Sequence, residues 1–145
     1  MSTLDKIRLA RQNKNPAILT DHIPYAKALG ITLSIEDDEL IGRMEFDQPL
    51  IGDLGVGALH GGTIATLLES TAILTLLWQI DDMNIPKTIN STVEFLQPGR
   101  PLPTYATAQI TRHGRRVANV RCTAWQKDRA APIAASYSHF LLVSS

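Results

Sequence analysis

The residues with the clearest potential for chemistry lie at the start of a long apolar segment, where His60 is followed by Gly61 and Gly62. The first amides of a helix have no partner within the helix and carry partial positive charge, so they can stabilise an anion or a developing oxyanion. Glycine at this point has no Cβ that would keep a ligand away from the backbone. His60 could donate a hydrogen bond to a carbonyl oxygen there. A second interpretation is a capping histidine followed by tight-turn glycines, with no chemistry.

Glu69 is the one carboxylate within the same apolar segment. Burying a carboxylate among leucine, alanine and isoleucine side chains costs free energy unless the group is paired or lines a cavity. In a cavity it could act as a general base or as a nucleophile. The alternatives are a helix position that meets water, or a partner such as arginine at a subunit contact.

The spacing of His60 and Glu69 adds a geometric constraint. Nine residues of helix place them roughly 13 Å apart along the axis and on opposite faces. One chain therefore cannot bring both groups to one substrate atom. If both act on the same ligand, the second must come from another subunit, and a two-fold dimer with a site at its interface is the simplest arrangement.

A long helix must hold these residues. The segment from Gly61 to Ile80 has no proline and is rich in leucine, alanine and isoleucine, which predicts a helix buried on several sides. Alternating apolar residues predict a hairpin over 31–46 with an acidic turn at 36–39. Four further strand-like runs predict a meander: 87–97, 102–113, 115–126 and 133–143. This order indicates an α+β fold with an antiparallel sheet.

Residues 1–29 are expected to form a helical cover at an edge of this fold. A short helix is predicted over 4–12, capped by Ser2 or Thr3, and a second over 23–29.

Composition and charge restrict the function classes. Residues 1–145 read as one domain, without linkers or repeats. Fourteen Lys and Arg balance fourteen Asp and Glu, so no bulk charge favours nucleic acid or an anionic membrane. Cys122 is the only cysteine, which excludes a disulfide within the chain. The charged N-terminus lacks the apolar core of a signal peptide, so we expect a soluble cytoplasmic protein.

Three stretches carry a resemblance to a known family. They are "GALHGGTIATLLEST", "TINSTVEFLQPGRP" and "ITRHGRRVANVRCTAWQKD". In this order the sequence resembles the hotdog-fold acyl-CoA thioesterases of the PaaI-like, or phenylacetate-pathway-like, group. The resemblance implies a long helix wrapped by a curved antiparallel sheet. It also implies homodimers with two inter-subunit sites, often paired into tetramers, and no metal or bound cofactor apart from the coenzyme A of the substrate.

The resemblance also implies roles for individual residues. The Gly61 N–H would polarise the thioester carbonyl, and His60 would orient or polarise it. Glu69 from the opposite subunit would act as nucleophile or as base for a water. Thr88 would assist near the attacking water.

Two residues next to this constellation are assigned to substrate binding, Gly62 and Asp53. Many relatives carry an asparagine six residues before the histidine, and here Leu54 occupies that position with Asp53 beside it. Asp53 is therefore a candidate substitute for that asparagine.

The turn "TRHGRRV" is basic, which is typical of a solvated hairpin end. Arginine also pairs bidentately with phosphate, and in related hotdog enzymes the nucleotide lies near this turn. Arg115 and Arg116 are therefore candidates for contacting coenzyme A, with Arg100 as a weaker one. The three other histidines lack metal-ligand spacing, so no metal site is expected.

The sequence thus predicts a thioesterase for a small aromatic or short-to-medium-chain acyl-CoA, acting through Gly61, His60 and Glu69. One alternative is a hotdog protein that binds acyl-CoA or another small ligand without turnover. Another is a hotdog hydratase or dehydratase, although those enzymes normally place the catalytic Asp and His in one chain. The end of the acyl pocket is expected to involve the N-terminal segment, together with Leu67, Ile73 and Trp78.

Overall fold

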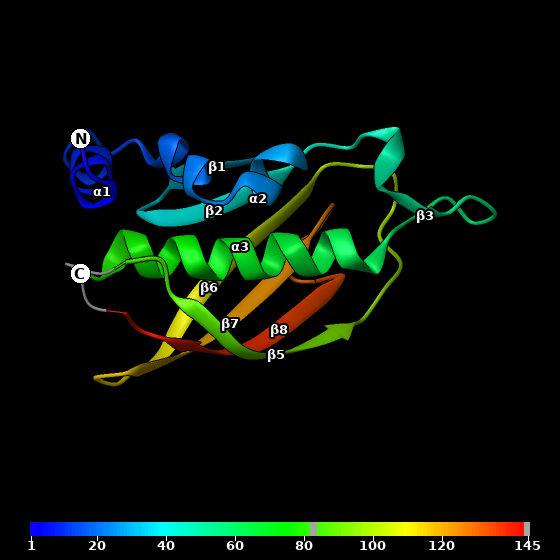
Figure 1. Cartoon of the computed structure of the whole chain (residues 1–145). Coiled ribbons are helices and arrows are strands. Elements are labelled where there is room, and N and C mark those ends of the chain that lie inside the picture. Colours follow the sequence, from blue (N-terminus) through cyan, green and yellow to red (C-terminus); the bar gives the residue numbers. More distant parts are fainter. Residues whose placement is uncertain (82–83, 144–145) are drawn as a thin grey trace.

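One long helix, α3 (Gly61–Gln79), lies against a six-stranded antiparallel sheet in the computed structural model, which describes residues 1–81 and 84–143 (Figure 1). The strands of this sheet are β1 (Ile31–Glu36), β2 (Glu39–Met44), β5 (Lys87–Phe95), β6 (Thr104–His113), β7 (Val117–Trp125) and β8 (Ala134–Leu141). The predicted α+β hotdog architecture, a long helix wrapped by an antiparallel sheet, is confirmed.

Smaller elements connect and cover this unit. They are α1 (Thr3–Gln12), the 3-10 helix η1 (Pro16–His22), α2 (Pro24–Ala28), the 3-10 helix η2 (Gln48–Leu50), β3 (Ile51–Asp53) and β4 (Ala58–Leu59). β3 and β4 pair as a two-stranded hairpin that protrudes beyond the start of α3 (Figure 1).

The strand order corrects one prediction. The six strands follow the order β1-β2-β6-β7-β8-β5, so only β6, β7 and β8 form a meander. The predicted four-strand meander is wrong for β5, which pairs with β8 at the edge of the sheet. The connection 96–103 contains three prolines and is too long and stiff for a hairpin turn, so β6 joins β2 instead.

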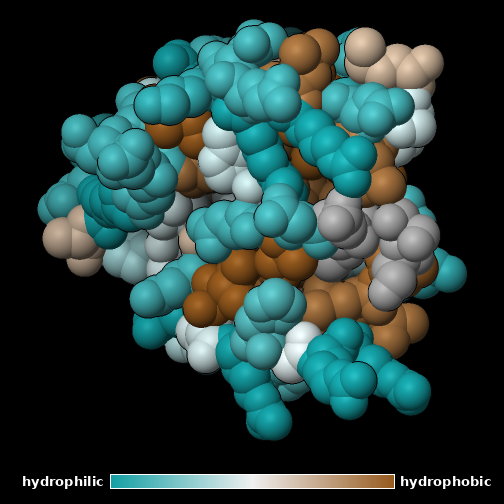
Figure 2. Space-filling model, turned by 90° about the vertical axis from the view of Figure 1, so that its left-hand side faces the viewer, coloured by the Kyte–Doolittle hydropathy of each residue, from teal (hydrophilic) through white to brown (hydrophobic). Residues whose placement is uncertain are grey.

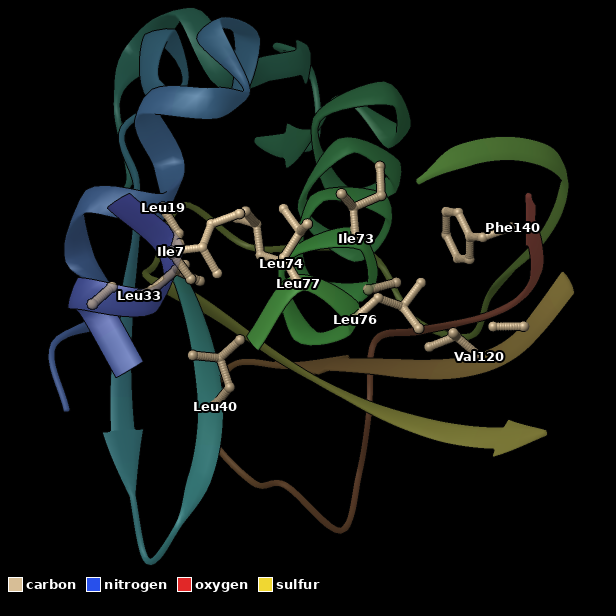
Figure 3. Packing of buried hydrophobic residues seen from close by; sticks show 13 residues of the cluster. Ile7, Leu19, Leu33, Leu40, Ile73, Leu74, Leu76, Leu77, Val120 and Phe140 are labelled. Carbon is tan, nitrogen blue, oxygen red and sulfur yellow. The ribbon is translucent and has the colours of Figure 1, made fainter. Parts of the chain in front are cut away.

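Most of α3 is buried, as its all-round apolar composition predicts. Two clusters of hydrophobic side chains pack around it, and Figure 3 shows the one at its C-terminal half, where Leu74 and Leu77 face Ile7 and Leu19 of the N-terminal cover. The length and composition of α3 would also suit a membrane span, but 67% of its apolar window is buried inside the fold, which is typical of a core helix.

The helix approaches the sheet closely at Gly42 of β2. A Cβ built on Gly42 would lie 2.3 Å from the Thr71 Oγ1, a distance that no side chain can tolerate. The Thr71 hydroxyl therefore occupies the space that a side chain at position 42 would need.

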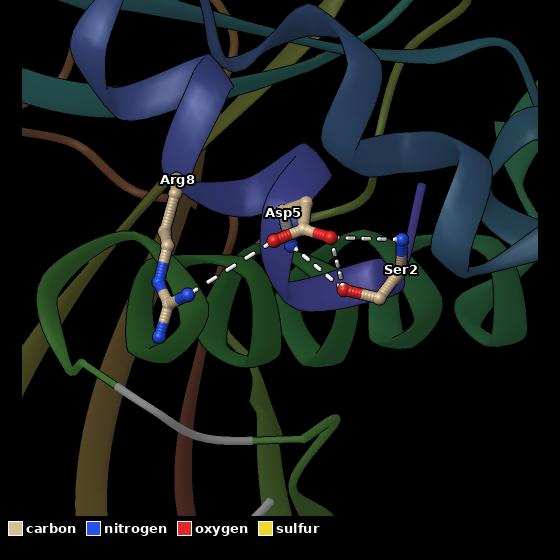
Figure 4. Close-up of polar contacts among 3 residues, drawn as sticks. All are labelled: Ser2, Asp5 and Arg8. Atoms are coloured by element: carbon tan, nitrogen blue, oxygen red, sulfur yellow. Dashed lines mark hydrogen bonds and ion pairs between the residues drawn. The ribbon is translucent and has the colours of Figure 1, made fainter.

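The N-terminal cover begins with a capping box. The Ser2 Oγ accepts from the Asp5 N–H at 3.2 Å, the Ser2 N–H donates to the Asp5 carboxylate at 3.1 Å, and Arg8 pairs with the same carboxylate at 4.0 Å (Figure 4). Ser2 rather than Thr3 is therefore the cap.

Arg11 fastens this cover to the far end of α3. Its guanidinium donates to the Leu77 and Ile80 carbonyls and pairs with the Asp81 carboxylate. The Leu77 carbonyl lies in the last turn of α3 and the Ile80 carbonyl at its C-cap, where a cation also complements the helix dipole. Figure 2 views this end of the molecule, where hydrophilic side chains cover most of the surface and hydrophobic ones show between them.

Candidate active site

His60 caps the N-terminus of α3. Its backbone is extended, with φ −63° and ψ 129°, and its Nδ1 accepts from the Gly62 N–H at 2.8 Å. A Cβ on Gly62 would lie 2.9 Å from this nitrogen, so glycine makes room for the imidazole. The predicted capping role of His60 is therefore confirmed. Because an amide can only donate, the neutral ring carries its proton on Nε2, and this N–H is left as a donor. Capping and polarisation of a carbonyl are thus compatible.

The Gly61 amide is the unused donor of this helix end. The Thr63 N–H donates to the His60 carbonyl at 3.0 Å, and the Gly62 N–H is taken by the imidazole. Within the described parts of the chain, the Gly61 N–H has no acceptor. The Phe95 ring lies beside Gly61, since a Cβ there would approach Phe95 Cζ to 3.1 Å. A helix N-terminus with one free amide is the geometry that an oxyanion requires.

Glu69 lies on the face of α3 that the sheet leaves uncovered. Gly62 is exposed and Ala65, Thr66 and Glu69 are half-buried, and these residues share one side of the helix. The Thr88 hydroxyl donates to the Glu69 Oε1 at 2.9 Å. No cation of the described residues lies within ion-pair distance of Glu69. The carboxylate is therefore held by one hydroxyl and is otherwise partly exposed to solvent.

The two halves of the predicted constellation lie at opposite ends of β5. Glu69 is bonded to Thr88 at the start of this strand, whereas Gly61 lies against Phe95 at its end. The structure therefore brings Glu69 and Thr88 together and brings His60, Gly61 and Gly62 together. It does not join the two groups within one chain.

A pocket of about 930 Å³ lies between α2 and the first turns of α3, and we call it the N-terminal pocket. Its lining is mainly apolar at α2 and around β3, with two carboxylates and the site residues His60 and Gly62. The lining includes Tyr25, Ala28, Leu29, Glu45, Phe46, Asp47, Pro49, Leu50, Ile51, His60, Gly62, Thr63 and Thr66.

Part of the expected acyl-pocket lining lies elsewhere. The N-terminal segment does line this pocket, but Leu67 and Ile73 are packed in the hydrophobic core. Trp78 lies near the C-terminal end of α3, beside Arg11 and Lys14. The sequence could not distinguish apolar helix residues that face the sheet from those that face a cavity.

The basic turn between β6 and β7 forms a second pocket, which we call the arginine pocket. Arg112, Arg115, Arg116, Asn119 and His139 line it, together with Gly114 and Val117. No carboxylate is among these lining residues. The sequence predicted Arg115 and Arg116. It missed Asn119 and His139, which face each other across β7 and β8.

The remaining two predicted residues have different surroundings. The Asp53 Oδ1 accepts from the amides of Gly55 at 2.9 Å and Val56 at 3.4 Å, so this carboxylate organises its own loop. Arg100 follows β5, and its backbone amide and carbonyl are both bonded to the Gln126 side chain. The neighbouring Gly99 carbonyl accepts from the Leu59 N–H just before α3, so Arg100 lies near the α3 N-terminus, and it is exposed and does not line the arginine pocket.

Metal ligands do not gather in this region. Across residues 1–81 and 84–143, no group of three or more His, Cys, Asp or Glu side chains is arranged to hold an ion. The arrangement offers instead an oxyanion donor, a carboxylate with a hydroxyl partner, an apolar pocket and a cationic one.

Comparison with known proteins agrees with this chemistry. The family profile described as thioesterase superfamily matches residues 56–133. The medium/long-chain acyl-CoA thioesterase YigI of Escherichia coli (strain K12) is 31% identical over 114 residues, which are 69% of this chain and 74% of YigI.

Solved structures share the fold over nearly the whole chain. A crystal structure of a Chromobacterium violaceum protein aligns with a TM-score of 0.78 and 36% identity, covering 96% of this chain and 97% of that one. A Bacillus halodurans protein, crystallised with CoA, has a TM-score of 0.74 at 18% identity, over 100% of this chain and 97% of its own, and shows a likeness of fold alone.

Proposed function

The chain belongs to the thioesterase superfamily and is an acyl-CoA thioesterase, and we propose that it hydrolyses thioesters of small aromatic or short-to-medium-chain acids at a site shared by two subunits. The observation that carries this proposal is the unpaired Gly61 N–H at the N-terminus of α3. Medium chain length is the range that the sequence expectation shares with the substrates named for the E. coli relative.

The edge strand β5 is the surface through which we expect the second subunit to bind. Its residues are exposed apart from a half-buried Val93, and Ile89 and Phe95 are 54% and 56% exposed. An unpaired edge with hydrophobic side chains favours pairing with another strand. A two-fold axis places the same strand of each copy at the contact, so the two β5 strands run antiparallel.

This pairing would complete the site. In an antiparallel pair centred on the strand, the start of one β5 lies beside the end of the other. The partner subunit's Thr88 and the partner subunit's Glu69 would then approach the Phe95 end of β5, next to Gly61. Because Glu69 and the Gly61 amide lie at opposite ends of β5 in one chain, antiparallel pairing brings the carboxylate of one subunit next to the amide of the other.

Hydrolysis would proceed by general-base or nucleophilic catalysis. As a base, the partner subunit's Glu69 takes a proton from water, and the oxygen of that water bonds to the thioester carbon. The oxyanion forms beside the Gly61 N–H and the His60 Nε2–H, which stabilise it more than the neutral carbonyl. The C–S bond then breaks, CoA leaves as the thiolate and takes up a proton, and the acid is released. As a nucleophile, the carboxylate would form an anhydride that water cleaves.

We assign the phosphates of CoA to the arginine pocket. Its three arginines and the absence of a lining carboxylate favour polyanions. In the β5-paired dimer the partner subunit's Arg115 and the partner subunit's Arg116 would lie beyond the start of its β5, towards Arg100 of the first subunit. We also propose that the protein belongs to the PaaI-like group and acts in the cytoplasm, and that two of its dimers can pair as a tetramer.

The test combines turnover with subunit complementation. CoA release from a panel of aromatic and aliphatic acyl-CoAs should be lost in Glu69→Gln and in Gly61→Pro, which lacks the amide N–H. A heterodimer of these two variants, purified through two different tags, retains one intact site and should recover about half of the wild-type activity. An inactive heterodimer, or an active monomer, would refute the shared site. Binding of acyl-CoA without release of CoA would refute hydrolysis.

A further inference from the structure

The inference concerns the N-terminal pocket and rests on the proposed function. We propose that this pocket holds the acyl group, and that Asp47 and Glu45 in its wall select acyl groups without a terminal carboxylate. The substrate class is then a neutral alkyl or aryl acid, and monothioesters of dicarboxylic acids are disfavoured.

The pocket begins at the reacting group. His60 and Gly62, which flank the free Gly61 amide, belong to its lining, and so does Thr66 one turn further along α3. Gly61 itself lines a separate, smaller pocket with Phe95. A carbonyl carbon held at this helix end therefore lies next to the N-terminal pocket through His60 and Gly62. Away from the helix the wall is apolar, with Leu29, Phe46 and Leu50 among its residues. Apolar lining with few polar groups is typical of a site for a hydrocarbon chain or ring.

Charge distinguishes the two ends of the substrate. Among the described residues that line the N-terminal pocket, Glu45 and Asp47 are the carboxylates, and neither lysine nor arginine is present. The arginine pocket has the opposite composition. A CoA nucleotide carries several negative charges, so it is repelled from the first pocket and attracted to the second. The acyl end is the part of the substrate that remains for the N-terminal pocket.

The two carboxylates are not equally compensated. Glu45 pairs with Arg43 at 2.5 Å, and the Arg43 guanidinium stacks on Tyr105, so this cation is held by the sheet and does not line the pocket. The Asp47 Oδ1 accepts only the Gln48 N–H, at 2.9 Å, and no cation of the described residues pairs with it. Asp47 is therefore the main source of negative potential at the pocket, and Glu45 contributes less.

Binding of non-hydrolysable thioethers tests the assignment without requiring turnover. Hexyl-CoA and 5-carboxypentyl-CoA differ only in the terminal group, and calorimetry gives the ratio of their dissociation constants. We expect the wild type to bind hexyl-CoA about tenfold more tightly. The double variant Asp47→Asn/Glu45→Gln should narrow this ratio by about threefold, because both carboxylates are exposed and screened by solvent. Both substitutions preserve shape, and asparagine retains the helix-capping ability of Asp47. Glu36→Gln, at the exposed last residue of β1, is the matched control and should leave the ratio unchanged.

A second variant tests where the chain lies. Ala28→Trp adds bulk at an exposed position of α2 that lines the pocket, and it should weaken dodecyl-CoA about tenfold more than butyl-CoA. Equal binding of the two hexyl analogues by the wild type would overturn the proposal. The proposal would also be overturned if the double variant kept the wild-type ratio of the two dissociation constants, or if Ala28→Trp weakened dodecyl-CoA and butyl-CoA equally. Parallel turnover assays with hexanoyl-CoA and adipoyl-CoA separate the proposed hydrolysis from the proposed selectivity. If the thioethers bind with the expected ratio but neither thioester is cleaved, hydrolysis is refuted and the pocket assignment stands.

Discussion

Gly61→Pro removes the proposed oxyanion donor with little change elsewhere. Gly61 is the first residue of α3, a position where proline is favoured because its missing N–H has no partner within the helix. The preceding residue, His60, has φ −63° and ψ 129°, which is the extended conformation that proline requires before it. The backbone therefore accepts the substitution, and the Phe95 ring, whose Cζ would lie 3.1 Å from the new Cβ, must shift by a few tenths of an ångström.

The magnitudes separate chemistry from folding. Loss of one oxyanion donor costs about 3 kcal/mol in the barrier, which is a fall of more than about 100-fold in kcat. Gly61→Ala is the matched control, because it introduces the same Cβ against Phe95, at 3.1 Å from Cζ, and keeps the N–H. Proline at a compatible site changes the free energy of unfolding by about 1 kcal/mol or less.

The assay is release of free CoA followed by a thiol reagent, with urea denaturation of each variant in parallel. We expect Gly61→Ala to retain most of its kcat and Gly61→Pro to lose it, at similar stability. Equal kcat values for the two variants would show that the Gly61 N–H does not act on the carbonyl.

Three further predictions concern other contacts. Thr88→Val removes the hydroxyl that donates to Glu69, so kcat should fall about tenfold while Thr88→Ser retains it; equal activity of the two variants would show that this hydrogen bond does not position the carboxylate. Arg11→Ala frees the last carbonyls of α3, and because the Arg11 side chain is only 20% exposed, urea denaturation should show a loss of about 2 kcal/mol, whereas a loss below about 0.5 kcal/mol would contradict the described clamp. The hydrogen bond from Arg129 lowers the pKa of Glu39, so its folded pKa lies below the unfolded value, and the stabilisation is present at neutral pH and lost as the pH falls through the folded pKa. Glu39→Gln should therefore cost about 0.5 kcal/mol at pH 7, since the side chain is 37% exposed and screened, and nothing at pH 2; an equal cost at both values would refute the ionic origin.

Local patterns predicted the elements well. The apolar, proline-free segment gave α3 within one residue of its observed end, and alternation gave the strands β1 and β2 with their acidic turn. The helix start also predicted the free amide of Gly61, because the first turn of any helix lacks internal acceptors. These features depend on residues near one another in the sequence.

Features that depend on distant residues were harder to predict. The pairing of β5 with β8 depends on the path of the chain after Phe95. The alternation of apolar residues predicts a strand but not its neighbour in the sheet. Nineteen residues separate Glu69 from Thr88, so their hydrogen bond could not be derived from spacing, although the family resemblance placed Thr88 near the reacting water. His139 lines the arginine pocket because β8 pairs with β7 in a register that places it opposite Asn119.

The contact between Gly42 and Thr71 has a consequence for how substitutions in this protein are interpreted. The Gly42 backbone packs directly against the Thr71 side chain, so this contact fixes the distance between α3 and the sheet at one point in the interior. A screen of random substitutions would record position 42 as intolerant of even alanine, although Gly42 is not one of the groups assigned to the reaction. Such a loss of function would report a displaced scaffold and not a missing chemical group.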